Sequence, residues 1–260
     1  MINYLFFFFY VNILPGDLMD TKYLLITGAY RGIGKAIVNY FANLGVNIIM
    51  TYHTKMNETI KLGKELEEKY HVNVECFYLD LSDEKSVKEL YKNVKEKCHK
   101  IDYLINNAAI SMDSYLFDKT KEEFMKVMEV NVIGTFLMMK YFDKIVDGYI
   151  FNMSSTDGID TGSVYSIDYN ASKAAINSIT KTFSLESDNV IIGICPNWVD
   201  TESTREMDKE YLDSELKRIK QNKLIGATII PKVIMDCIKN NTPTGSIIRI
   251  EGDEDVRRVD

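Results

Sequence analysis

Short apolar runs alternate with longer charged segments along most of the chain, as in "KYLLIT" at 22–27 followed by "GKAIVNYFANLG" at 34–45. The apolar runs are typical of strands buried on both faces, and the charged segments place apolar residues at helical spacing. The predicted strands are 22–27, 46–52, 74–80, 101–109, 148–155, 190–196 and 245–252. The predicted helices are 34–45, 57–70, 84–98, 121–142, 168–185 and 230–240.

Strands that alternate with helices predict an α/β fold, because parallel strands need crossover connections that cover both faces of the sheet. We expect one Rossmann-type doubly wound parallel sheet of about seven strands with helices on both faces. No internal repeat or low-complexity linker interrupts the pattern, so residues 19–260 are predicted to form a single domain.

The first 18 residues differ from the rest, because residues 4–14 form an apolar run that only Asn12 interrupts. This run is shorter than the roughly 20 residues that span a bilayer. A signal peptide would carry a basic residue ahead of the run, but the first one is Lys22. Two interpretations stay open: a disordered or weakly membrane-associating leader, or upstream sequence ahead of a natural start at Met19. We favour the second, which mass spectrometry of the native N-terminus tests.

Overall charge argues against some partners. The formal net charge is −7 and the sequence pI is about 5.2, with basic residues interspersed among acids, so we expect no nucleic-acid partner. The four cysteines and three histidines are scattered without ligand spacing, so we expect no metal. Free thiols are typical of a reducing compartment, and we expect a cytoplasmic protein without a membrane span.

A glycine-rich turn, "TGAYRGIG" at 27–34, joins the first predicted strand to the first helix. Gly28 suits a tight turn, Gly32 lets the backbone approach a phosphate, and Gly34 lets the helix pack close to the strand. The N-terminus of the helix would offer free N–H groups to a pyrophosphate. The alternative is a plain strand-to-helix turn.

The end of the second predicted strand bears on which dinucleotide would bind. An acid about 20 residues past the glycines would hold the ribose 2′-hydroxyl of NAD. Here Tyr52 and His53 occupy that place, and the nearest acid is Glu58. Arg31 in the turn, with His53 and Lys55, favours a 2′-phosphate and therefore NADP(H) over NAD(H). The alternative is that Arg31 only faces solvent.

A tyrosine and a lysine in "YNASK" at 169–173 are one helical turn apart. Reduction of a ketone needs a hydride on carbon and a proton on oxygen. Tyr169 could supply the proton, because an ammonium group such as that of Lys173 favours the phenolate. Tyr165 has no lysine at this spacing and would instead shape a substrate pocket.

In this order along the chain, "TGAYRGIG", "DLSD" (80–83), "NNAA" (106–109), Asn131, "SS" (154–155) and "YNASK" resemble the short-chain dehydrogenase/reductase family. The resemblance extends from residue 22 to about 252, and it is strongest to members that act as 3-oxoacyl-[acyl-carrier-protein] reductases. Two departures are visible: Ala109 and Asn197 stand where the family commonly has glycine.

The resemblance implies a role for individual residues. It implies a catalytic set of Asn131, Ser155, Tyr169 and Lys173, with Ser155 chosen over Ser154 because the family pattern has the second serine there. The implied cofactor-binding residues are Gly28, Tyr30, Arg31, Gly32, Ile33, Gly34, Tyr52, His53, Asp80, Leu81, Asn107, Ala108, Tyr169, Lys173, Pro196, Val199 and Thr201.

These residues predict an NADPH-dependent oxidoreductase that interconverts a carbonyl and an alcohol. The alternative function is a non-catalytic NADPH-binding sensor or scaffold, which would bind the cofactor without turnover. The substrate is a small carbonyl or alcohol compound. Residues 202–226 are expected to form a charged helical lid, and few basic residues lie in 142–148 and 186–189, which disfavours an acidic acyl-carrier protein.

The predicted helix 121–142 carries more apolar side chains than one sheet face needs. The resemblance implies subunit contacts through this helix and the Tyr169 helix, so a homodimer or homotetramer is expected. The alternative is a deeply buried helix in a monomer, and light scattering separates the two.

Overall fold

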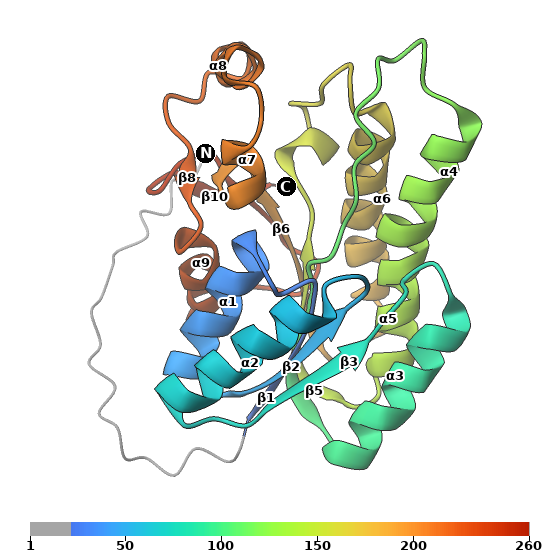
Figure 1. Cartoon of the computed structure of the whole chain (residues 1–260), viewed down its shortest axis with the longest axis vertical. Helices are drawn as coiled ribbons and strands as arrows, with labels where there is room; N and C mark the ends of the chain where they lie inside the picture. Colours follow the sequence, from blue (N-terminus) through green and yellow to red (C-terminus); the bar gives the residue numbers. More distant parts are fainter. Residues whose placement is uncertain (1–21, 260) are drawn as a thin grey trace.

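The computed structural model describes residues 22–259. Within them, eight strands form one sheet in the order β10-β9-β6-β5-β4-β1-β2-β3 (Figure 1). All neighbours pair in parallel except β10, which pairs antiparallel with β9. The strands are β1 Tyr23–Thr27, β2 Asn47–Tyr52, β3 Val74–Tyr78, β4 Ile101–Asn106, β5 Val146–Met153, β6 Val190–Pro196, β9 Ile247–Ile250 and β10 Val256–Val259.

Helices cover both faces of the sheet, as Figure 1 shows. One face packs against α1 (Gly32–Asn43), α2 (Met56–Tyr70) and α9 (Ile229–Lys239). The other packs against α3 (Glu84–Lys97), α5 (Gly134–Phe142) and α6 (Ile167–Phe183). α4 (Lys121–Met128) packs on α6.

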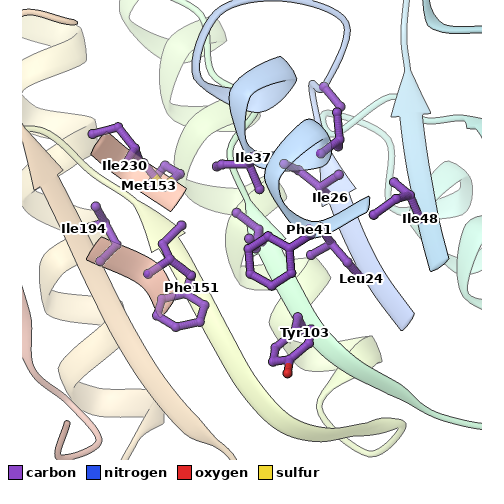
Figure 2. Close-up of a cluster of buried hydrophobic side chains, with 14 of the residues drawn as sticks. Leu24, Ile26, Ile37, Phe41, Ile48, Tyr103, Phe151, Met153, Ile194 and Ile230 are labelled. Carbon is purple, nitrogen blue, oxygen red and sulfur yellow. The ribbon is translucent and has the colours of Figure 1, made fainter. Parts of the chain in front are cut away.

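Successive side chains of a strand point to opposite faces of the sheet, and both faces are covered here, which explains why the central strands have few polar positions. In β1, Leu24 and Ile26 point to one helical layer and Leu25 points to the other, and all three are fully buried. Figure 2 shows the first of these layers, where the Phe41 ring of α1 lies over the sheet near Leu24 and Tyr103. A sheet covered on both faces needs apolar residues at odd and even positions alike.

The order of the strands predicts where a ligand-binding crevice lies. The chain winds from β1 toward β3 in one direction and from β4 toward β9 in the other, so the switch point lies between β1 and β4. Ligands of doubly wound sheets bind at the carboxyl ends of the strands at this point. The segments that follow β1, β4, β5 and β6 therefore meet at one edge.

The predicted α/β class, with its doubly wound and mostly parallel sheet, is confirmed. The expected count of about seven strands is one short, because β10 adds an antiparallel edge strand. Its sequence "VRRV" is short and half charged, so it has no apolar run to find.

Two helix predictions need correction. The helix expected at 121–142 is divided into α4 and α5 by a π-helical turn at Glu129–Ile133. The lid expected at 202–226 is two short helices, α7 (Glu202–Arg205) and α8 (Lys209–Arg218), followed by a residue pair, β8 (Ile225–Gly226), that bonds to β7 (Val199–Asp200).

The prediction made for residues 1–18 lies outside the described residues. In residues 22–259, none of the helices combines the length and the apolar character that crossing a membrane requires.

Candidate active site

The glycine turn after β1 has the geometry that only glycine adopts readily. Gly28 and Gly32 have φ angles of 68° and 54°, in the left-handed region. A Cβ on Gly34 would lie 2.4 Å from the carbonyl oxygen of Gly28, so the start of α1 packs directly on the turn. The tight turn and the close packing predicted for these glycines are both present.

The end of β4 holds this turn in place. The Asn107 side chain donates to the carbonyl oxygens of Thr27 and Gly28 at 3.0 and 2.8 Å. The backbone N–H groups of Asn107 and Ala108 both donate to the Thr27 hydroxyl at 3.0 Å. Asn107 thus supports the turn with its side chain. Ala108 packs against the turn, because a Cβ added to Gly28 would lie 2.9 Å from the Ala108 Cα.

An anionic group already occupies the N-terminus of α1. The Gly32 N–H donates to the Glu202 carboxylate at 2.9 Å, and α1 has no acid in its own first turn. The N-cap, Arg31, makes no side-chain capping bond. Hydrogen bonds from backbone N–H groups, those of Glu202 itself and of Gly32, hold the pKa of the Glu202 carboxyl below its usual value. The turn is therefore built to bind a negative group.

The residues predicted to surround the adenosine end lie after β1, β2 and β3. The His53 ring nitrogen is 3.7 Å from the Asp80 carboxylate, and its ring centroid is 5.9 Å from that of Tyr78. Arg31 and His53 are both exposed, and no acid replaces them at the end of β2. Leu81 is buried against Gly134, the first residue of α5. A Cβ added to Gly134 would lie 2.7 Å from the Leu81 Cβ.

The end of β6 approaches the same turn. Pro196 ends β6, Val199 pairs with β8, and Thr201 caps α7 by accepting from the Thr204 N–H at 3.3 Å. A Cβ on Gly32 would lie 3.4 Å from the Thr201 methyl group. Asn197 has a negative φ and buries its side chain against the Thr156 hydroxyl, so replacing the family glycine leaves the turn unstrained.

Tyr169 and Lys173 lie on one face of α6 beside the end of β5. The Lys173 ammonium is 5.2 Å from the centre of the Tyr169 ring and donates to the Met153 carbonyl at 2.7 Å. Burial raises the pKa of the Tyr169 phenol, and the Ser155 side chain beside it acts to lower that pKa. The Ser154 hydroxyl instead donates to the backbone carbonyl of Lys173 at 2.9 Å. Of the two serines, Ser155 is the one at the phenol.

Burial sets the protonation states of this group. Burial, with a smaller effect from the Asp157 carboxylate, raises the pKa of Tyr169, so the phenol is protonated at neutral pH. Burial lowers the pKa of Lys173 to about 8, so the ammonium is still mostly charged at pH 7. The prediction that the lysine lowers the tyrosine pKa is wrong for this structure, because desolvation raises that pKa instead.

Asn131 lies in the π-helical turn between α4 and α5. It is fully buried, and its side chain exchanges two hydrogen bonds of 2.9 Å with the Ile110 backbone. It also donates to the Ser172 hydroxyl at 3.0 Å. Asn131 thus ties the strand-end loop after β4 to the helix that carries Tyr169 and Lys173.

Comparisons with known proteins agree with this geometry. The family model of short chain dehydrogenases matches residues 22–212. The chain belongs to the short-chain dehydrogenase family.

Individual relatives extend the match to nearly the whole chain. The 3-oxoacyl-[acyl-carrier-protein] reductase of Thermotoga maritima is 31% identical over 245 residues, covering 90% of this chain and 98% of the relative. An alcohol dehydrogenase of the archaeon Thermococcus sibiricus, solved with 5-hydroxy-NADP, has a TM-score of 0.74 at 26% identity, covering 90% of this chain and 95% of that one. A short-chain dehydrogenase of Burkholderia cenocepacia, solved with NADP, has a TM-score of 0.82 at 21% identity, covering 90% and 98%. The predicted family and its likeness to acyl-carrier-protein reductases are confirmed.

Some residues of this short-chain dehydrogenase site were not foreseen from the sequence. Asp157, two residues after Ser155, is partly buried near the phenol, and burial raises its own pKa. Glu202 binds the glycine turn across 170 residues of sequence. Lys119 and Asp168 form a buried ion pair next to Tyr169. None of them belongs to a motif, so only the fold brings them to the site.

The depressed pKa of Lys173 predicts how stability depends on pH. Because the unfolded lysine keeps its usual pKa of 10.5, it binds a proton more tightly than the folded one, whose pKa is about 8. The wild-type free energy of unfolding should therefore rise as pH increases from about 8 to about 10.5. At pH 7 Lys173→Met should be more stable by about 1–3 kcal/mol, since it removes the buried charge but also loses one hydrogen bond.

Denaturant titrations at pH 7 and pH 10 measure this. The advantage of Lys173→Met should shrink at the higher pH, where the wild-type lysine is neutral when folded. An advantage that stays constant or grows would contradict the buried, weakly basic lysine. Lys181→Met, on the same helix and exposed, is the matched control and should show no pH-dependent difference.

Proposed function

We propose that this protein is an NADP(H)-dependent oxidoreductase that interconverts a carbonyl and an alcohol on a small molecule. The observation that carries the proposal is the grouping of a protonated tyrosine, a serine hydroxyl and a buried ammonium at the carboxyl end of β5. The group lies at the edge of the sheet that also carries the glycine turn. A proton donor and a dinucleotide turn at one crevice are what carbonyl reduction requires.

The chain's residues fit the cofactor. At Gly32 an added Cβ would meet nothing closer than 3.4 Å, and the Gly32 N–H already donates to a carboxylate, so a pyrophosphate could approach the turn there. Arg31 and His53 would bind the 2′-phosphate, since no acid stands at the end of β2 to hold a free ribose hydroxyl. NADP in the solved relatives from Thermococcus sibiricus and Burkholderia cenocepacia supports this preference.

The nicotinamide, when bound, supplies or accepts the hydride. The chain's own residues handle the proton and the charge. Ser155 would hold the substrate oxygen, and Tyr169 would donate its phenolic proton to that oxygen during reduction. Lys173 would stabilise the resulting phenolate, and its burial strengthens that attraction because little water screens it. Asn131 would keep α6 in register with the loop after β4.

Tyr169→Phe tests the assignment of the proton donor. It removes the phenolic hydroxyl and keeps the ring, so kcat for NADPH-dependent ketone reduction should fall about 10²- to 10⁴-fold. The dissociation constant for NADPH, from fluorescence titration, should change less than about threefold. Tyr165→Phe is the matched control and should retain most turnover. Unchanged kcat in Tyr169→Phe would sink the assignment.

Glu202→Gln tests the anion site at the glycine turn. The Glu202 carboxylate must leave the Gly32 N–H before a cofactor phosphate can use it, and its charge opposes the pyrophosphate. The neutral variant should therefore bind NADPH about three- to tenfold more tightly, corresponding to roughly 1 kcal/mol. Fluorescence titration measures this, with Glu206→Gln on the same segment as the control. Weaker binding by Glu202→Gln would show that the carboxylate supports the cofactor site instead of competing for it.

A further inference from the structure

A buried ion pair lies beside the proposed proton donor. The Lys119 ammonium is 3.0 Å from the Asp168 carboxylate, and their side chains are only 4% and 0% exposed. Lys119 stands in the loop just before α4. Asp168 lies in the first turn of α6 and directly precedes Tyr169. No part of the reaction proposed above uses either charge.

Both charges are expensive to bury. A buried ion pair often contributes little net stability, and apolar replacements of similar volume can be neutral or stabilising. Removing only one partner is costly, because an uncompensated charge stays in the interior. The pair is therefore better explained by the segments that it holds together than by a contribution to stability.

The Lys119 ammonium links its own loop to α6. Lys119 Nζ donates to the Met112 carbonyl as well as to Asp168, and the Lys119 N–H donates to the Tyr115 carbonyl at 3.0 Å. The loop 112–119 is thus closed on itself and tied to α6. At the other end of the pair, the Asp168 carboxylate accepts from the Tyr169 N–H at 2.8 Å. The N-cap residue, Ser166, makes no side-chain capping bond. The Asp168 carboxylate instead accepts a hydrogen bond from a backbone N–H in the first turn of the helix.

The tethered loop lies beside the site. It carries Asp113, which is among the charges that raise the pKa of Tyr169. It also carries Tyr115, whose ring centre is 5.8 Å from that of Tyr165. The Tyr165 ring is in turn 5.9 Å from that of Tyr211 on α8. A row of rings therefore runs from the loop, across the segment before α6, to the lid.

We propose that Lys119 and Asp168 are positioning residues that lock loop 112–119 onto the first turn of α6. The lock holds Tyr169 in line with the substrate oxygen and holds the tyrosine row beside it. This inference rests on the proposed carbonyl–alcohol activity for its catalytic consequence, and on the structure alone for the tether.

The test compares Lys119→Met with the neutral double variant Lys119→Met/Asp168→Asn. The single variant leaves a buried carboxylate unpaired and should lower the melting temperature. The double variant removes that charge, while the side-chain carbonyl of the introduced asparagine still accepts from the Tyr169 N–H, so stability should largely return. Turnover should not return: kcat/KM for the carbonyl substrate should stay at least tenfold below wild type. The dissociation constant for NADPH should stay within twofold of wild type.

Amide hydrogen exchange supplies a readout that needs no turnover. Peptides covering 112–119 should exchange at least tenfold faster in the double variant, while peptides from β1 and α1 should not change. The matched control is the exposed pair of Lys97 and Glu75, 2.8 Å apart, replaced as Lys97→Met/Glu75→Gln. The control should match wild type in loop exchange and kcat/KM.

Two outcomes would overturn the proposal. One is a double variant whose kcat/KM recovers together with its stability, which would make the pair structural only. The other is unchanged exchange in 112–119, which would show that the loop does not depend on the tether. If the double variant does not fold, Asp168→Asn alone tests the proposal. This variant weakens the tether and should lower kcat/KM about threefold or more. An unchanged kcat/KM would refute the proposal. A wild-type protein without turnover on any carbonyl would refute the proposed function, and loop exchange would still decide the tether.

Discussion

The docking of α6 on the end of β5 is the contact on which the site depends. The Lys173 ammonium donates to the Met153 carbonyl, and the Ser154 hydroxyl donates back to the Lys173 carbonyl. The absence of a side chain at Gly158 lets the backbones meet, because a Cβ there would lie 2.5 Å from the Lys173 carbonyl carbon. This close approach brings Tyr169 to Ser155, and it also removes Lys173 from water. The burial that positions the residues thus also sets their pKa values.

A second constraint acts at the opposite side of the switch point. The glycine turn can only be as tight as it is because Asn107, at the end of the neighbouring strand, satisfies its carbonyl groups. The turn then leaves the N–H groups of α1 free for an anion, and in this structure Glu202 supplies one. The lid segment that starts with Glu202 is therefore connected to the cofactor turn. The tyrosine row connects α8 of the lid, through Tyr211, to the substrate side.

Local pattern was enough to predict most of the fold and to locate the sequence motifs. β1, β2, β4, β5 and β6 are apolar on both faces, so their run lengths mark them in the sequence. The sequence pattern did not predict β10, because an edge strand tolerates charged residues and therefore has no apolar run. The break between α4 and α5 also escaped, since the residues of 121–142 suit one continuous helix and the π-turn is stabilised by tertiary contacts of Asn131 with Ile110 and Ser172.

The parts of the site that could not be predicted are pairs distant in sequence. Lys119 and Asp168 are 49 residues apart, and neither has a neighbour whose spacing suggests a partner. Glu202 looks like an ordinary acid at the start of a charged lid. By contrast, Tyr169 and Lys173 are one helical turn apart, so their relation can be read directly from the chain.

The most direct test of the central claim follows the transferred hydrogen itself. NADPH deuterated at nicotinamide C4, on the face from which the hydride leaves, would be incubated with the protein and a panel of neutral ketones, and the alcohols analysed by mass spectrometry. We expect alcohol carrying one deuterium on the carbinol carbon, with one NADPH oxidised for each alcohol formed. Saturable NADPH binding with no deuterated alcohol from any ketone would contradict the proposed activity, and would favour a protein that senses the cofactor.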